Sequence, residues 1–210
     1  MNVVRFILQN RGQVLELTGE HVWLVGLSTL FATLIGIPLG ILIAHRPRLH
    51  KPVLTSANII QTVPSLALFG FLLPVPWLGD RADRLAILAL TLYALLPVIR
   101  NTYTGIRGVD PAVVEAGRGM GLTSSQMLFQ VELPLAMSVI LSGVRTALVI
   151  SVGLATIAAA IGAGGLGEFI FRGLAMVDDR VILAGAIPAA LMAIVADLGL
   201  GWLERRLQPQ

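Results

Sequence analysis

The 210-residue chain contains no cysteine and few charged residues. The absence of cysteine excludes disulfides, thiolate nucleophiles and cysteine-ligated metals. Charged residues make up 13% of the chain, whereas soluble domains average about 25%. Hydrophobic residues make up 56%, and the mean hydropathy is +0.84. This composition excludes an ordinary soluble enzyme, a disordered tail and a nucleic-acid-binding domain, and it is typical of a polytopic membrane protein.

Apolar runs long enough to cross a bilayer recur along the chain. A helix needs about 20 apolar residues to span the hydrocarbon core. Five stretches meet this requirement, roughly 22–44, 53–75, 85–105, 135–160 and 181–203. The segment 156–176 is apolar but rich in glycine, which suggests a short re-entrant or surface helix and leaves six spans as the alternative. We therefore predict an all-α membrane bundle of five, or alternatively six, transmembrane helices.

The two ends of the chain are more polar than its middle. Residues 1–20 carry acidic and basic side chains, and no signal-peptide h-region or cleavage site precedes the first apolar run. We expect a short amphipathic leader at 1–20, a transmembrane domain at 21–205 and a C-terminal tail at 206–210.

Basic residues indicate the orientation. The tightest cluster, Arg46, Arg48 and Lys51, lies between the first two spans. Because lysine and arginine are enriched in cytoplasmic loops, this connection is predicted to be inside. The N-terminus would then lie outside and the C-terminus in the cytoplasm.

The connection between the third and fourth spans, roughly 106–134, is much longer than a usual helix connection and carries helix signals. Asp110-Pro111 is typical of an N-cap followed by proline at the first helical position. Gly119 and Gly121 can end that helix, and 123–126 is a capping box for a second one. We predict two short helices joined by a glycine turn on the inner membrane face, either anchored among lipid headgroups or docked to a cytoplasmic partner.

The same loop contains a spaced motif. Glu115-Ala116-Gly117 is followed after three residues by Gly121, and after nine more by Val131-Glu132-Leu133-Pro134. This arrangement resembles the EAA loop of ABC-importer permeases, whose pattern is E-A-A, three residues, G, nine residues, I-x-L-P. Gly117 and Val131 depart from that pattern, and glycine would loosen the helix by up to about 1 kcal/mol relative to alanine. Pro134 is predicted to mark the start of the fourth span.

The resemblance extends over roughly 20–205, where the chain looks similar to permeases of osmoprotectant uptake systems. The stretches that carry it are 60–68, 101–103, 161–167 and 182–188. It implies a substrate such as glycine betaine, choline, carnitine or proline betaine, which nothing in the composition or periodicity shows. Within the same family, a permease for methionine or another small polar solute is the alternative.

The resemblance also implies a fold, partners and coupling residues. The fold is that of a type I importer permease with cytoplasmic coupling helices, in a bacterial inner membrane. The implied protein partners are two ATPase subunits, a second permease subunit that is identical or similar, and a periplasmic or lipid-anchored solute-binding protein. The chain would also contact membrane lipid, and no nucleic acid is implied. The implied ATPase-coupling residues are Glu115, Ala116, Gly117, Gly121, Leu133 and Pro134. Because no Walker A sequence occurs, we expect a transport subunit and not an enzyme, with no cofactor or metal.

Breaks and charges inside the spans are candidates for the pathway or its gates. These are Pro64, Arg145, Gly164, Gly165 and Pro188. Arg145 could face a water-filled pathway or pair with an acidic residue inside the bundle.

The glycines at 162–167 also fit the dinucleotide pattern G-x-G-x-x-G. They follow a membrane-length apolar run, and no acidic residue lies about 20 positions further on, so we expect a glycine turn at the outer membrane face instead.

Two other classes of function fit less well. A secondary transporter or channel would need coupling carboxylates in mid-span, where only Asp197 qualifies and no inverted repeat is visible. An intramembrane enzyme would need a Ser/His pair, paired aspartates or an HExxH motif, all of which are missing. Aromatic residues are only 6% and lie mostly near span ends, so we expect recognition of a quaternary ammonium ligand to reside on a separate binding protein.

Overall fold

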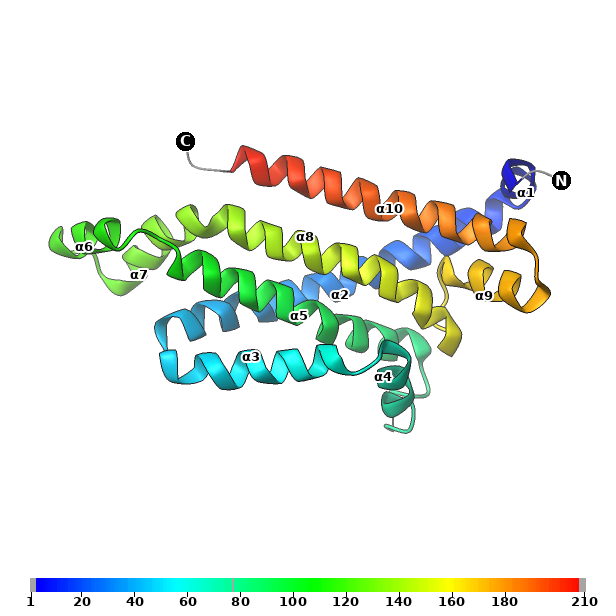
Figure 1. The fold of residues 1–210 in the computed structure, drawn as a ribbon, viewed down its shortest axis with the longest axis horizontal. Coiled ribbons are helices and arrows are strands. Elements are labelled where there is room, and N and C mark those ends of the chain that lie inside the picture. Colours follow the sequence, from blue (N-terminus) through cyan, green and yellow to red (C-terminus); the bar gives the residue numbers. More distant parts are fainter. Residues whose placement is uncertain (1–2, 77, 208–210) are drawn as a thin grey trace.

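The computed structural model describes residues 3–76 and 78–207, and helices make up all the regular structure in this part of the chain. The elements, in chain order, are α1 (Val3–Gln9), α2 (Arg11–His45), α3 (Pro47–Thr62), α4 (Ser65–Leu72), α5 (Ala82–Arg107), α6 (Pro111–Gly119), α7 (Ser124–Met127), the π-helical turn η1 (Leu128–Glu132), α8 (Leu133–Ala158), the 3₁₀ turn η2 (Ala159–Ile161), α9 (Gly167–Met176) and α10 (Asp179–Arg206). The long helices lie side by side, with α6 and α7 at one end and α1 and α9 at the other (Figure 1). The predicted all-α class is confirmed.

Four helices in the described part are long and apolar enough to cross a membrane, and a bent pair could supply a fifth. The four are α2, α5, α8 with its preceding turns, and α10. They correspond to the first, third, fourth and fifth predicted spans. The segment predicted as re-entrant contains α9, a helix of 10 residues, so the described residues provide no sixth span.

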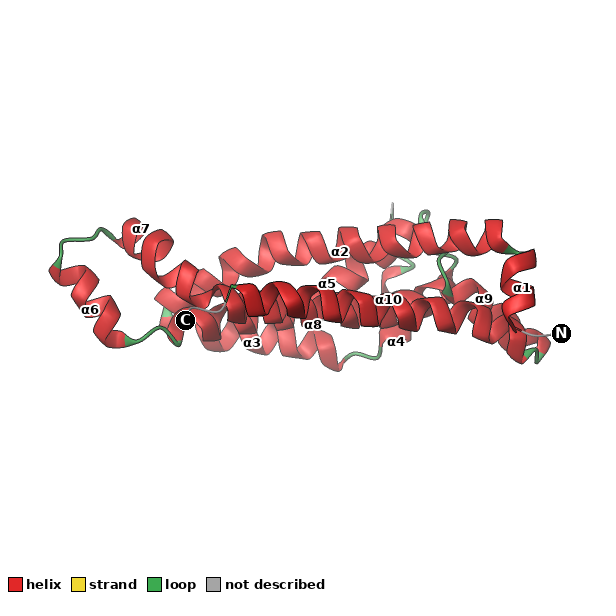
Figure 2. Cartoon of the chain, turned by 90° about the horizontal axis from the view of Figure 1, so that it is seen from above, coloured by secondary structure: helices red, strands yellow, loops and turns green. Residues whose placement is uncertain are grey.

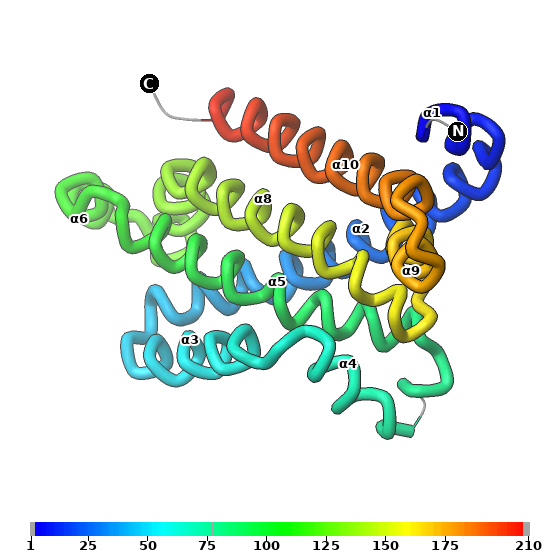
Figure 3. The backbone as a smooth tube through the Cα atoms, turned by 45° about the vertical axis from the view of Figure 1, so that its right-hand side comes forward, coloured from blue at the N-terminus to red at the C-terminus, as the bar shows by residue number. Residues whose placement is uncertain are grey.

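The second predicted span, 53–75, is not one straight helix. Its two parts, α3 and α4, meet at an angle of 97° (Figure 3). The break has a local cause, because proline pushes the residue before it out of the helical region. Val63 has φ −68° and ψ 126°, and Pro64 begins α4 as its N-cap. The Tyr93 hydroxyl donates to the Val63 carbonyl, which α3 leaves free at the break.

The first span begins earlier than predicted. α2 is continuous from Arg11 to His45, so residues 11–20 of the predicted leader belong to the same helix as the span, and only α1 is separate. At the other end, α10 continues through Arg206. The remainder of the predicted tail, 208–210, and residues 1–2 of the leader lie outside the described residues.

α5 is the central helix of the bundle. Buried small and apolar residues line it, including Ala86, Ala89 and Ala94, each fully buried. Glycines on its neighbours let the backbones approach closely. A Cβ on Gly36 of α2 would lie 2.8 Å from Val98 Cγ1, and a Cβ on Gly143 of α8 would lie 2.8 Å from the Pro97 carbonyl oxygen. The helices around α5 are therefore placed by steric fit.

The long loop forms the predicted first helix, and its caps are as expected. The Ala112 N–H donates to the Asp110 carboxylate over 2.8 Å, and α6 ends at Gly119. Gly121 has φ +84°, a left-handed conformation that favours glycine. The capping box between Thr123 and Gln126 is also present.

The fourth predicted span corresponds to α8, which carries Pro134 in its first turn as expected, but this helix continues directly from the turns before it. α7, η1, α8 and η2 form one helical segment from Ser124 to Ile161, so the helix begins ten residues before Pro134. The π-helical turn explains why proline does not interrupt it. The Leu133 N–H donates to the Leu128 carbonyl, and this wider spacing shifts the register just before the residue that lacks an N–H.

Candidate coupling and pathway sites

The α6 elbow, defined as residues 110–127, projects beyond the ends of the long helices (Figure 2). Glu115, Ala116 and Gly121 are exposed on it, and apolar side chains accompany them. Met120 is 77% exposed and Val113 is 43% exposed. An exposed surface that combines apolar groups with a carboxylate, on a helix capped at both ends, can bind a groove on another protein as a rigid body.

Gly117 faces inward, unlike its neighbours in the motif. A Cβ at this position would lie 2.6 Å from Met127 Cε and 3.2 Å from Leu122 Cδ1. The missing side chain lets α6 fold back closely onto α7. This contact gives a structural reason for glycine in place of the alanine of the family pattern.

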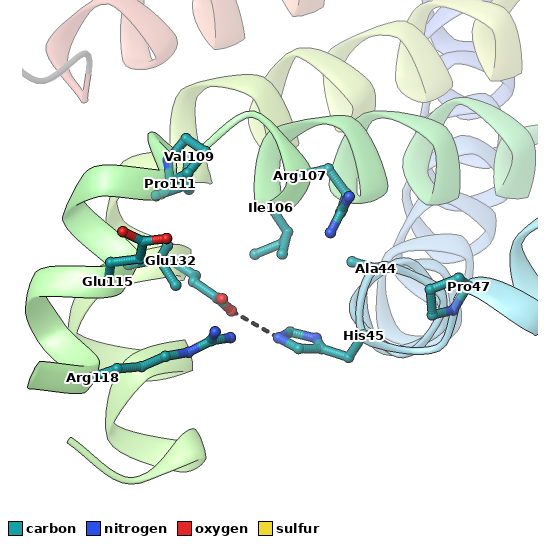
Figure 4. A pocket seen from close by; sticks show the side chains of 11 residues that line it. Ala44, His45, Pro47, Ile106, Arg107, Val109, Pro111, Glu115, Arg118 and Glu132 are labelled. Atoms are coloured by element: carbon teal, nitrogen blue, oxygen red, sulfur yellow. Dashed lines mark ion pairs between the residues drawn. The ribbon is translucent and has the colours of Figure 1, made fainter. Parts of the chain in front are cut away.

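A cavity of about 350 Å³ lies between the α6 elbow and the adjacent end of the bundle (Figure 4). His45, the last residue of α2, pairs with Glu132 of η1, with 3.0 Å between Nε2 and Oε2. Glu132 is 8% exposed. Glu115 and Arg118 of α6 line the same cavity, and Arg118 points toward the pair (Figure 4). The structure thus brings the two halves of the sequence motif together around the contact between His45 and Glu132.

The amino-acid sequence does not reveal this contact. Glu132 occupies the variable position of the family pattern, and the separation of 87 residues from His45 gives no local signal. The only hint was a carboxylate next to a long apolar run.

Leu133 and Pro134, the end of the motif, form the first turn of α8. Leu133 packs against a buried cluster that includes Ala44, Ile106 and Ile140. This cluster joins α2, α5 and α8 directly beneath the elbow. The two residues therefore link the elbow to the bundle.

Arg145 pairs with acidic residues on α10. Its Nε lies 3.4 Å from Asp197 Oδ1, and its Nη1 lies 3.1 Å from Glu204 Oε2. Gly201 makes room for the guanidinium, since a Cβ there would lie 2.7 Å from Arg145 Nη1. Of the two alternatives for Arg145, the geometry favours pairing within the bundle. Asp197, the one candidate for a coupling carboxylate in mid-span, is a partner in this pairing.

Gly164 and Gly165 form a turn between η2 and α9. Both have left-handed backbones, with φ of +81° and +80°. The Gly165 N–H donates to Glu20 Oε2 over 2.9 Å, and a Cβ on Gly164 would overlap the same carboxylate. Beside it, the buried His21 places Nε2 3.1 Å from the Val152 carbonyl oxygen. The turn is therefore built onto α2, at the end of the molecule opposite the α6 elbow (Figure 1).

The two prolines among the pathway candidates behave differently. Pro64 lies at the bend between α3 and α4, where the Gln61 amide also holds α3 to α5 through a 2.8 Å hydrogen bond to the Tyr93 carbonyl. Pro188 lies inside α10, which continues past it without interruption. In the described residues, no group of three or more His, Asp or Glu side chains could hold a metal ion.

Known proteins resemble the chain over nearly its whole length. A family model described as "Binding-protein-dependent transport system inner membrane component" matches residues 36–209. The chain is 52% identical over 202 residues to the glycine betaine/carnitine/choline transport system permease protein OpuCD of Bacillus subtilis (strain 168), which covers 96% of this chain and 87% of that protein. It is 49% identical over 214 residues to the choline transport system permease protein OpuBD of the same organism, which covers 100% of this chain and 93% of that protein.

The fold also has a solved counterpart. The structure of the MetNI methionine ABC transporter in an inward-facing conformation contains a chain that superposes with a TM-score of 0.86. The match covers 95% of this chain and 98% of that chain at 22% sequence identity. The predicted importer-permease fold is therefore confirmed.

Proposed function

This chain belongs to the family of binding-protein-dependent transport system inner membrane components, and from this premise we propose that it moves small quaternary ammonium osmoprotectants through the inner membrane. The observation that carries the substrate class is the 52% identity, over 96% of the chain, to a glycine betaine/carnitine/choline permease. The likeness to a methionine transporter is a likeness of fold at 22% identity and does not extend to its substrate.

Transport would be driven from outside this chain. It is a transport subunit, and ATP hydrolysis takes place on two ATPase subunits that dock at its inner face. A second permease subunit, identical or similar, completes the pathway, and a periplasmic or lipid-anchored binding protein delivers the solute. The N-terminus then lies outside and the C-terminus in the cytoplasm, with the Arg46–Lys51 cluster at the inner face in agreement with the positive-inside rule.

The α6 elbow is the ATPase-coupling element in this proposal. Glu115, Ala116 and Gly121 form its exposed surface, and Gly117 fixes its shape from within. Its movement passes into the membrane because the helix that starts at Ser124 continues without a break to Ile161. The His45–Glu132 pair and the buried contacts of Leu133 tie the same movement to α2 and α5.

The gates lie at the breaks in the bundle. The bend at Pro64 changes the direction of the second span, and the Gly164-Gly165 turn closes onto Glu20 at the outer end. Pro188 leaves α10 one backbone hydrogen bond short, which makes this helix easier to bend. Arg145 sets the position of α10 relative to α8 through its two ion pairs. ATPase closure can bias the two open states only through contacts that differ between them, and these elements supply such contacts.

Reconstitution of the importer in liposomes tests the proposed function. Vesicles that hold the permease and the ATPase should take up labelled glycine betaine, carnitine or choline when ATP and the binding protein are supplied. Without the binding protein, uptake should fall at least about tenfold, because capture of the solute then depends on the weak affinity of the permease alone. Uptake of none of the three compounds by the complete system would contradict the substrate class, and full-rate uptake without the binding protein would contradict the delivery step.

A further inference from the structure

A small cavity with a mixed polar and apolar lining lies between α3, α5 and α8, away from the α6 elbow. Its volume is about 230 Å³. Gln61 of α3, Arg100 and Asn101 of α5 and Thr146 of α8 give it a polar lining, and apolar side chains complete it. Ligand pockets for drug-sized molecules span about 300–1,000 Å³, so this cavity suits a small metabolite.

Arg100 is exposed although it lies inside a span. It is seven residues from the end of α5 at Arg107, which corresponds to about 10 Å along the helix axis. A guanidinium on a membrane-spanning helix is costly against lipid, and charged residues in spans almost always face the bundle interior or a water-filled pathway. Its Nη2 donates to Asn58 Oδ1 over 3.1 Å, which uses one of its five N–H donors.

The two amides of the cavity are oriented by the protein. The Gln61 side-chain N–H donates to the Tyr93 carbonyl over 2.8 Å, and the Asn101 side-chain N–H donates to the Pro97 carbonyl over 2.9 Å. In both cases the backbone of α5 accepts from one amide N–H, so each nitrogen is anchored and the carbonyl oxygen lies on the other side of the amide. A carbonyl dipole attracts a trimethylammonium group, which has no N–H to donate.

We propose that this cavity is a transient binding site for the solute during its passage, and that it takes a zwitterion with a carboxylate at one end and a quaternary ammonium at the other. The Arg100 guanidinium binds the carboxylate through a bidentate contact, which is the strong form of this interaction. The oxygens of Gln61 and Asn101 face the ammonium end. This inference rests on the proposed function and adds to it a group that distinguishes glycine betaine and carnitine from choline, which has no carboxylate.

Uptake by the complete importer tests this site, with rates normalised to the amount of permease in the membrane. Arg100→Gln should lower the maximal uptake rate of glycine betaine and carnitine at least about tenfold, since a hydrogen bond to a charged group contributes about 1.5–3 kcal/mol. Choline uptake should change less than about threefold, because choline offers Arg100 no carboxylate. The substrate concentration at half-maximal rate should stay unchanged, because the binding protein that captures the solute sets this concentration. Arg100→Lys keeps the charge and should retain more zwitterion transport than Arg100→Gln.

Arg84→Gln is the matched control, because it removes one exposed positive charge from the other end of α5. It should leave the rates for all three compounds unchanged. Equal losses for choline and the zwitterions in Arg100→Gln, or no loss for either, would overturn the site and leave the proposed function intact. If the wild-type importer carries only the zwitterions, equal rates in Arg100→Lys and Arg100→Gln would overturn it. Failure of the wild type to import any of the three compounds would instead contradict the proposed function.

Discussion

Replacing Glu115 with arginine and Gly121 with aspartate should abolish coupled uptake while the permease still inserts into the membrane. Both residues are exposed on the α6 elbow, so the bundle itself does not depend on them. Charge reversal at a docking surface costs several kcal/mol, and we therefore expect uptake to fall at least about a hundredfold. The aspartate adds backbone strain, because Gly121 has a left-handed φ of +84°.

Co-purification of the ATPase with the permease measures this effect directly. The double variant should lose the ATPase, and the basal ATPase activity of the separate subunit should be unaffected. The chain offers a matched control at its other end, where Gly12→Asp with Glu16→Arg makes the same exchange at exposed positions of α2. That control should retain the ATPase. Unchanged co-purification together with unchanged uptake in the elbow variant would show that docking takes place elsewhere.

Replacing Arg145 with leucine should destabilise the permease and separate α10 from α8. The substitution leaves the carboxylates of Asp197 and Glu204 without their cation. Removing one partner of a fully buried pair costs about 3–5 kcal/mol, and we expect about 2–3 kcal/mol here because the Asp197 side chain is 52% exposed. The thermal midpoint of the purified transporter in detergent should fall accordingly.

A rescue experiment separates this structural role from a role in the pathway. Adding Asp197→Asn and Glu204→Gln to Arg145→Leu removes the unpaired charges and should restore more than half of the lost stability. Full stability of Arg145→Leu combined with lost uptake would instead favour the reading in which Arg145 faces the solute.

The local features of the α6 elbow could be predicted from sequence because their causes are local. An Asp-Pro pair sets the start of α6, glycine at a left-handed position follows its end, and Thr123 with Gln126 caps the next helix. Each depends on a few neighbouring residues, whose preferences the sequence shows directly. The spans were predictable for a similar reason, since their length and hydropathy follow from the bilayer thickness.

Features that depend on distant residues were not predictable. Pro64 explains locally why α3 ends, but the 97° angle could not be predicted, because the ends of the break are also held by the distant Tyr93 of α5. The continuity of the helix past Pro134 depends on the π-helical turn, for which no reliable sequence signal exists. The pairs His45–Glu132 and Arg145–Glu204 join residues far apart in the chain, and only the packed bundle brings them together.

The α6 elbow must lie on the cytoplasmic side of the membrane if an ATPase is to bind it. The natural chain has no cysteine, so a single Met120→Cys variant carries the only thiol. Met120 is 77% exposed, which makes the position accessible. Val177→Cys, at the opposite end and 88% exposed, is the matched control. In intact cells, a membrane-impermeant maleimide should label position 177 but not position 120. In inside-out vesicles it should label position 120, and bound ATPase should protect that position from labelling. Labelling of position 120 from outside intact cells would contradict the account.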